Sequence, residues 1–226
     1  MVKNAQADDK TSKAEATRAL ILEAALDQFR EKGFDAATMQ GIADHAGVAK
    51  SAAYYYFPAK EAIINAYYDS IQSQSEVICA EAYAAMPKLR DRLGVAMMTK
   101  LDLAKRDRRL LGIVFRYTGE PEHPLSCLGK EQSAMRVRAV AVFRDALRGE
   151  KLPADLDELL PVSLWSLQMG LLILFLYDNS PNQRRTRRLA DGALDLTMKL
   201  LLLAKLPVLR PVRTRVLSLL REAELL

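Results

Sequence analysis

The sequence predicts an all-α protein in which a small N-terminal domain of three helices precedes a larger helical domain, with about nine or ten helices in all. Apolar residues recur every three or four positions along most of the 226 residues, which is the spacing of one helix face. Prolines and glycines separate these periodic segments, and none of the segments alternates in the manner of a β-strand. Half of the residues are apolar, so the chain is able to bury a substantial core.

The first predicted helix follows a polar N-terminal stretch. Residues 1–11 are expected to form a disordered arm because they contain few apolar side chains. Ser12 and Glu15 have the spacing of a capping box, and Gly33 provides the ending of the helix. The apolar positions between them have helical spacing: Ile21, Ala25 and Phe29.

Two short helices joined by a tight turn come next. Thr38 is placed to cap the first of them, and Gly47 is able to adopt the positive φ that the turn requires. The second helix is predicted from about Lys50 to Tyr56. The small side chain of Ala43 allows the two helices to approach each other closely. This pattern is a helix-turn-helix, whose second helix enters the major groove of DNA.

The remainder of the chain is expected to be helical as well. A long helix is predicted from Lys60 to Met86, where Pro87 stops it. Further helices are predicted over residues 88–105, 107–118, 124–148, 155–178, 182–205 and 208–224.

Net charge does not locate a nucleic-acid-binding surface in this chain. The formal charge is +5, but basic and acidic residues are equal in number up to Lys60, so the excess lies in the rest of the chain. The local arrangement is more informative, because no acidic residue occurs between His45 and Lys60. This segment is therefore able to approach phosphate without like-charge repulsion.

The numbers of cysteines and histidines and the length of the apolar runs limit the function classes that remain. Two cysteines and two histidines are too few and too scattered for a metal site, so we expect no metal, no cofactor and a reduced, cytoplasmic protein. The longest apolar run, 162–177, is shorter than the ~20 residues of a membrane span, so no membrane partner is expected. Motifs of nucleophilic, phosphate-binding or zinc-dependent catalysis are absent, so we expect no enzymatic activity.

The order of these signals resembles the DNA-binding signature of the TetR family of transcriptional regulators. The residues that carry the resemblance are Thr38, Ile42-Ala43, Ala46-Gly47-Val48, Lys50, Tyr54-Tyr55-Tyr56-Phe57 and Lys60-Glu61. It extends over roughly residues 12–66. The resemblance implies a homodimer, most often a repressor, that binds a palindromic DNA operator and a small, mostly apolar effector.

Candidate DNA contacts follow from the positions of the motif. Thr38 and Gln40 open the first short helix, and Lys50 and Ser51 open the second. Helix-terminal N–H groups and lysine bind phosphate, whereas lysine also reaches guanine edges and alanine touches thymine methyl groups. The predicted DNA-binding residues are Thr38, Gln40, Lys50, Ser51, Ala52, Tyr54, Tyr55 and Lys60. Tyr56 and Phe57 are assigned to the core.

A dimer interface is predicted on the two helices that follow Pro153. Apolar residues occupy every face of 162–177, as expected of a helix covered by its own domain on one side and by a partner on the other. These two helices are read as half of a four-helix interface, with ordinary monomer core as the alternative. The predicted interface residues are Leu164, Leu171, Phe175, Leu189, Ala193, Leu196 and Leu200.

An effector pocket is the remaining expectation. Methionine and aromatic side chains line adaptable apolar cavities, although they also fill plain cores. The candidate lining residues are Met97, Met98, Leu101, Phe115, Tyr117, Met135, Phe143, Trp165 and Met169.

The chain is therefore divided into the arm at 1–11, a helix-turn-helix domain at 12–58 and an effector-binding and dimerisation domain at 59–226. Two alternatives are a DNA-binding dimer that needs no effector and a helical protein-interaction or membrane-peripheral adaptor without DNA binding.

Overall fold

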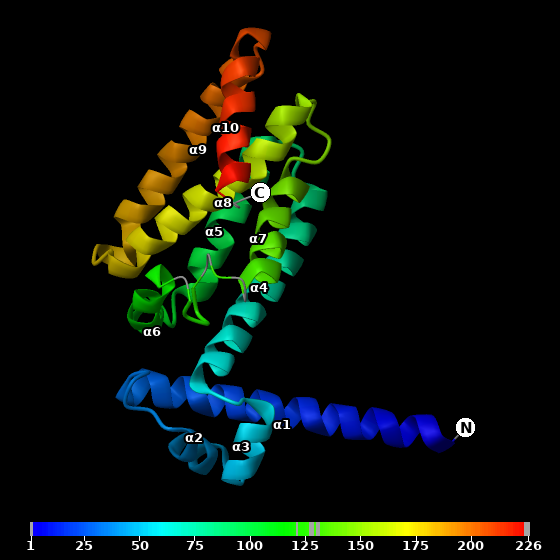
Figure 1. Ribbon diagram of the computed structural model, residues 1–226, viewed down its shortest axis with the longest axis vertical. Helices are drawn as coiled ribbons and strands as arrows, with labels where there is room; N and C mark the ends of the chain where they lie inside the picture. The colour runs from blue at the N-terminus through cyan, green and yellow to red at the C-terminus, as the bar shows by residue number, and fades with distance from the viewer. Residues whose placement is uncertain (1, 121, 127–128, 130–131, 224–226) are drawn as a thin grey trace. The chain divides into compact units, whose positions relative to one another are not determined.

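The predicted all-α fold is confirmed. The computed structural model describes residues 2–120, 122–126, 129 and 132–223, with side chains from Lys13 onward except that of Thr118. Within these residues the chain forms ten α-helices with short 3₁₀ segments and no strand (Figure 1). The helices pack into two compact units: 1–70 with 109–131, and 71–108 with 132–226.

The N-terminal unit contains the predicted helix-turn-helix. Its elements are α1 (Val2–Lys32), α2 (Met39–Ala46), α3 (Lys50–Tyr56), the first part of α4 (Lys60–Ala85), most of α6 (Arg108–Val114) and the 3₁₀ segment η1 (Phe115–Gly119). Residues 109–131 thus group with this unit, whereas the predicted division assigns every residue after 58 to the second domain.

Helix α1 begins earlier than predicted and ends where expected. It runs through residues 2–11, the predicted arm, where no glycine or proline interrupts the backbone hydrogen bonds of a helix. Its end is set by Gly33, which has a φ of 84° and donates its N–H to the Phe29 carbonyl at 3.0 Å. The positive φ is accessible to glycine at little cost, so the chain leaves the helix here.

The turn between α2 and α3 has the predicted chemistry. The Thr38 hydroxyl accepts a hydrogen bond from the Gly41 N–H at 3.1 Å and caps α2. Gly47 has a φ of 65°, and the Val48 N–H then donates to the Ala43 carbonyl at 3.0 Å. Ala43 is completely buried, so α2 and α3 approach each other through its methyl group.

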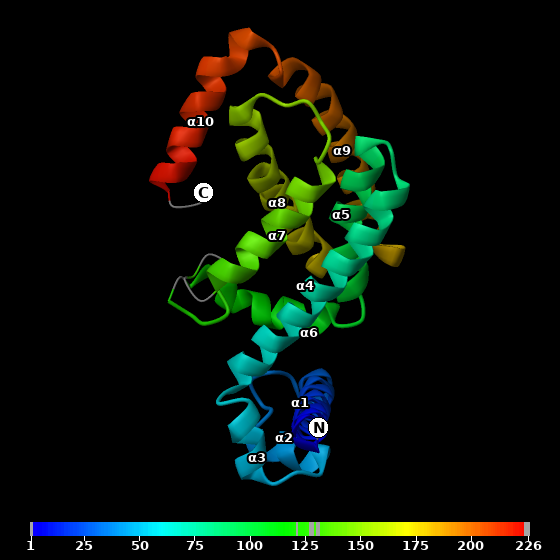
Figure 2. The ribbon, with the colours of Figure 1, turned by 90° about the vertical axis from the view of Figure 1, so that its right-hand side faces the viewer.

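The second unit is built around a core between α5, α7, α8 and α9. Its elements are the second part of α4, α5 (Leu89–Ala104), α7 (Ser133–Ala146), α8 (Ala154–Tyr177), α9 (Arg184–Ala204) and α10 (Arg210–Glu222). Leu93, Met97, Phe143 and Leu194 are among the buried residues of this core. Figure 2 shows that α10 turns back after the end of α9, and α10 contacts α8.

The region between α6 and α7 departs from the predicted helices. The helix predicted over 107–118 corresponds to two elements, α6 and η1. Of the helix predicted over 124–148, the part from Ser133 onward forms α7. Before it, residues 122–126 contain successive turns, in which the His123 N–H donates to the Glu120 carbonyl and the Ser126 N–H to the His123 carbonyl, both at 2.9 Å. Pro124 lacks an amide hydrogen, which favours turns at this place. Part of the predicted helix, including Cys127, lies outside the described residues.

Among the described residues, α8 is long and apolar enough to cross a membrane by length and composition. Half of its most apolar window is buried inside the unit, and core helices of soluble proteins meet the same criterion.

Arg213 ties α8, α9 and α10 together. Its guanidinium bonds to the Asp155 carboxylate of α8 at 2.8 Å and to the carbonyls of Ala204 and Leu206 at the end of α9, at 2.5 and 3.1 Å. The Arg213 hydrogen bond lowers the pKa of the Asp155 carboxyl, and Arg213 itself is buried. The three partners together satisfy a charge that burial would otherwise disfavour.

We expect Arg213→Met to lower the free energy of unfolding by about 3 kcal/mol, because Asp155 and two carbonyls lose their buried partner. Chemical denaturation followed by circular dichroism measures the change. Arg215→Met is the matched control, since Arg215 is exposed and its ion pair with Glu222 is long, at 3.6 Å. Equal stability of the two variants would contradict the role of Arg213.

Candidate nucleic-acid interface

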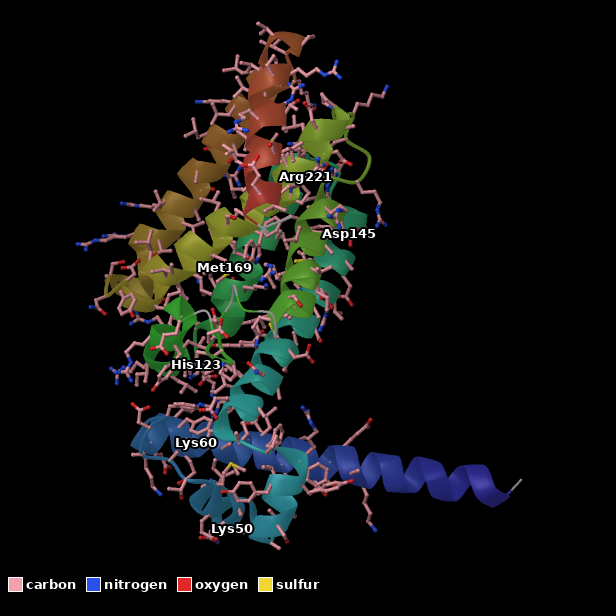
Figure 3. All side chains as sticks on the ribbon, viewed as in Figure 1. Lys50, Lys60, His123, Asp145, Met169 and Arg221 are labelled. Carbon is pink, nitrogen blue, oxygen red and sulfur yellow. The ribbon has the colours of Figure 1, made fainter. Side chains whose placement is uncertain are left out.

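Helix α3 presents a polar, basic face to solvent. Ala53 is completely buried and Phe57 nearly so, and they anchor the inner side of the helix. Lys50 and Ser51 are exposed, and Tyr54 and Tyr55 are 46% and 83% exposed. Figure 3 shows Lys50 at the edge of the unit formed by α2 and α3. Four of the predicted DNA-binding residues therefore share one accessible face, with the partly buried Ala52 beside them.

The aromatic side chains of α3 have partners within the helix. The Lys50 ammonium lies 6.0 Å from the centre of the Tyr54 ring, and the rings of Tyr55 and Tyr56 meet edge to face at 5.1 Å. Such contacts limit the rotamers of long side chains before any ligand binds. The face is thus partly ordered for contact with phosphate and base edges.

The start of α2 adds two further polar side chains. Thr38 and Gln40 are both exposed. Thr38 is already the cap of α2, and the Gln40 amide donates to the Asp44 carboxylate at 2.7 Å. The second N–H and the carbonyl oxygen of the Gln40 amide remain available for contact with DNA.

Lys60 has a different role from the predicted one. Its ammonium donates to the carbonyls of Phe34 and Asp35 at 2.6 and 3.2 Å and lies 4.7 Å from the centre of the Phe34 ring. It therefore closes the corner between α1 and α2, and Figure 3 shows it beside the end of α1. A phosphate contact of Lys60, as predicted, would compete with these bonds.

Arg18 is a basic residue of this region that the sequence analysis did not select. It is exposed on α1, and its guanidinium carbon lies 4.8 Å from the centre of the Phe57 ring at the end of α3. Nothing in the spacing of the motif places a residue of the first helix at the third. The contact supplies positive charge at the C-terminal end of α3.

The corner after α1 also binds η1. Asp35 accepts hydrogen bonds from the Tyr117 hydroxyl at 2.8 Å and from Arg116 at 3.0 Å. The Tyr117 bond, followed by Arg116, lowers the pKa of the Asp35 carboxyl, and the same bond raises the pKa of Tyr117. The Tyr117 ring stacks on His123 at 4.6 Å. Tyr117 thus faces the helix-turn-helix, and it and Phe115 belong to a different unit from the other predicted pocket residues.

An open groove of about 640 Å³ lies between α4, α5 and α7 in the second unit. It is lined by Glu76, Cys79, Ala80, Tyr83, Ala84, Arg92, Arg138, Ala141, Val142, Asp145 and Arg148. Cys79 is buried and free of any disulfide. Figure 3 labels Asp145 on α7 at this groove.

None of the nine predicted pocket residues lines this groove. Met97 and Leu101 of α5 and Phe143 of α7 are completely buried, and Trp165 is nearly so. They fill the core, which is the alternative that the sequence left open. The sequence signal that could have identified the groove is the row of polar and small residues on α4, in which Glu76, Ala80 and Tyr83 follow one another at helical spacing.

The surfaces of α8 and α9 alter the predicted dimer interface. Leu164, Leu171 and Phe175 are buried inside the unit, so these three predicted residues are unable to contact a partner. The exposed apolar residues of α8 are Ile173, Leu174 and Tyr177. On α9, the predicted residues Leu189, Leu196 and Leu200 are exposed, and Ala193 is partly buried.

The fold and the exposed face of α3 together define a helix-turn-helix protein whose reading helix is free to enter a DNA groove. Comparison with protein families gives the same class. Residues 21–67 match the model of bacterial regulatory proteins of the tetR family, and residues 92–216 match that of the tetracyclin repressor-like C-terminal domain. Because the second match alone covers more than half of the chain, the protein belongs to the TetR family and is a DNA-binding transcriptional regulator.

Individual relatives agree with this assignment. The chain is 28% identical over 169 residues to the probable regulator ArpR of Pseudomonas putida, which covers 70% of this chain and 80% of ArpR. It is 48% identical over 48 residues to the regulator RutR of Escherichia coli K12, covering 21% of this chain and 23% of RutR. It is also 44% identical over 54 residues to the uncharacterized regulator YuxN of Bacillus subtilis, covering 22% of this chain and 19% of YuxN. The last two matches therefore span about a fifth of those relatives.

Solved structures show the same fold. The transcriptional regulator FadR of Bacillus subtilis, in complex with stearoyl-CoA, has a TM-score of 0.62 at 17% identity and covers 78% of this chain and 96% of that one. A putative TetR-family regulator from Rhodococcus has a TM-score of 0.61 at 18% identity, covering 80% and 97%.

We expect Lys60→Met to lower the free energy of unfolding by about 2 kcal/mol, because two carbonyls lose a charged donor. Its DNA affinity should keep the salt dependence of the wild type, since no phosphate contact is removed. Lys50→Met is the matched comparison: it should leave stability unchanged and reduce the slope of log K against log salt by about 1. Denaturation and salt titrations on one duplex measure both. The reverse pattern would return Lys60 to the interface.

Proposed function

We propose that this regulator is a cytoplasmic, homodimeric repressor that binds a palindromic operator and is released from it by a small effector. Residues 12–58 serve as the DNA-binding domain, and residues 59–226 provide dimerisation and effector binding. The observation that carries the proposal is the exposed face of α3, where Lys50, Ser51, Tyr54 and Tyr55 lie together without an acidic neighbour in 46–59.

Dimerisation supports recognition of a two-part site. The α3 helix has seven residues, so one copy reaches only a few base pairs. Two copies about 34–36 Å apart contact successive major grooves on one side of B-form DNA. Binding of both copies then raises the affinity well above that of one, because the second contact is intramolecular.

Exposed apolar residues on α8 and α9 are the proposed dimer surface. Ile173, Leu174 and Tyr177 of α8 and Leu189, Leu196 and Leu200 of α9 are accessible in the single chain. Exposed apolar side chains in such number on two successive helices favour burial against a partner. A second copy of the same two helices completes a four-helix arrangement with twofold symmetry.

The effector is proposed to bind in the groove between α4, α5 and α7. Helix α4 continues without a break from this groove into the N-terminal unit, so a change of its inclination reaches the helix-turn-helix. The stearoyl-CoA in the structure of the FadR neighbour supports an effector with an apolar part. Release requires only that the effector prefer the dimer whose reading helices do not match the operator. A dimer that needs no effector would be expected to lack such a groove.

We expect Lys50→Ala to weaken binding to an operator selected from random duplexes by about 5- to 100-fold, in line with ~1–3 kcal/mol for a lysine contact to a base edge. Tyr55→Phe should weaken it less, because only the hydroxyl contact is lost. Fluorescence anisotropy measures the affinity and sedimentation confirms an intact dimer. Lys105→Ala, an exposed lysine of the second unit, is the control. Unchanged affinity in both variants would remove α3 from the DNA interface.

We expect Leu196→Glu or Ile173→Glu to convert the dimer to a monomer, because each places a charge in the apolar surface. Analytical ultracentrifugation measures the mass, and operator affinity should fall by roughly 100-fold as the second contact is lost. Val137→Glu is the matched control, since Val137 is an exposed apolar residue of α7 outside this surface. Dimers of unchanged mass in both α8 and α9 variants would refute the proposed interface.

A further inference from the structure

We propose that the groove between α4, α5 and α7 binds an effector that carries a carboxylate on an apolar body, and that Lys100 selects this charge. The inference rests on the proposed effector function and names the chemical class of the ligand. It is carried by the one lysine beside the groove whose charge the described residues leave unpaired.

The arginines of the groove are already neutralised. Three arginines line it, and each is hydrogen-bonded to its own carboxylate at 2.6–2.9 Å. The pairs are Arg92 with Glu150, Arg138 with Glu76 and Arg148 with Asp145. Glu76 is held most firmly, because both of its oxygens bond to Arg138 and one also accepts from Gln72. The hydrogen bond from Arg138 lowers the pKa of Glu76, which therefore stays ionised.

Lys100 on α5 is the exception to this pairing. It is partly buried and lies on the same face of α5 as the lining residue Arg92, two turns further along the helix, where the charges of Glu76 and Arg138 act on it. Within the part of the chain that the structure describes, its ammonium has no hydrogen bond and no ion pair. Burial lowers its pKa to about 8, so the group is still mainly protonated at neutral pH. A partly buried cation without a partner favours binding of an anion.

Two buried, uncharged side chains of α4 lie near residues that line the groove. Gln72 and Ser75 are buried on the same helix face as the lining residues Glu76 and Cys79, three or four positions away. The Gln72 side-chain oxygen and the Ser75 hydroxyl have no hydrogen-bond partner among the described residues. A buried polar atom without a partner costs about 1–3 kcal/mol. A ligand whose polar group reaches this depth recovers that cost, since the Ser75 hydroxyl donates to a carboxylate and Gln72 accepts from a hydroxyl or N–H.

Small apolar side chains of the lining suit an apolar body. Ala80, Ala84, Ala141 and Val142 leave room between α4 and α7 because their side chains are small. The Tyr83 hydroxyl donates to the Val142 carbonyl at 3.2 Å, so its hydrogen-bonding capacity is used within the protein. A cationic ligand would be repelled by the unpaired charge of Lys100, and a purely apolar one would leave Lys100 without a counter-charge. An amphipathic acid satisfies both parts of the groove.

Three probes that differ only in the head group test the inference: octanoate, octanol and octylamine. Isothermal titration at constant ionic strength should show octanoate binding the wild-type dimer at least about 10-fold more tightly than octanol, and octylamine more weakly than either. In Lys100→Met, octanoate should bind no more tightly than octanol. Lys105→Met, which removes an exposed lysine at the end of the same helix, should keep the wild-type preference.

Folding of the variants is checked by thermal melting without ligand. Lys100→Met removes an unpaired charge, so its melting temperature should equal or exceed that of the wild type, and Lys100→Gln is the second variant. The inference is overturned if octanol or octylamine binds the wild type as tightly as octanoate, or if both Lys100 variants keep the preference for octanoate. Operator release, measured by anisotropy with the same probes, separates the two proposals. Release by octanol alone would support the effector function and refute the anionic class of effector. Failure of the protein to bind any duplex would refute the repressor function, and the preference for octanoate would then still decide whether the groove binds a carboxylate.

Discussion

The close approach of α2 and α3 is the constraint on which the DNA-binding unit depends. Gly47 takes a positive φ and Ala43 is completely buried, so two short helices are held together by very few residues. Neither helix is long enough to be stable alone in water, and each is ordered by packing against the other and α1. With Ala53 and Phe57 turned inward, Lys50, Ser51, Tyr54 and Tyr55 have only the solvent side left. The exposed polar face of α3 is therefore a consequence of the buried one.

The DNA-binding unit extends beyond the helix-turn-helix. The Asp35 carboxylate accepts hydrogen bonds from Arg116 and Tyr117 of η1, while the Lys60 ammonium donates to the carbonyls of Phe34 and Asp35. These contacts close the corner between α1 and α2 with residues that are far from it in sequence. They also explain why 109–131 groups with the N-terminal unit. The segment that follows α5 is thus part of the body that presents α3 to DNA.

In the second unit, the distribution of partners distinguishes structure from binding. Arg213, Arg92, Arg138 and Arg148 each have a carboxylate within 2.9 Å, and the charges of such pairs are compensated in the folded chain. The Lys100 ammonium, the Gln72 side-chain oxygen and the Ser75 hydroxyl lack a partner among the described residues, and Gln72 and Ser75 lie within one or two helical turns of the lining residues Glu76 and Cys79. Because the arginines of this unit named above are paired, polar groups without a partner are exceptions that need an explanation, and these three are the contacts that we propose for a ligand.

The sequence by itself determined the all-α class, the family and the local geometry of the helix-turn-helix. The Thr38 cap, the Gly47 turn and the end of α1 at Gly33 each depend on hydrogen bonds or φ values within a few residues, and these are readable from neighbouring side chains. The tertiary structure decided the rest. Lys60 is occupied by carbonyls about 25 residues earlier in the chain, and Met97, Leu101 and Phe143 of the pocket prediction are completely buried. Helix α8 is apolar on every face, so its sequence carries no information about which face is buried, and only packing turned Phe175 inward and left Ile173 exposed.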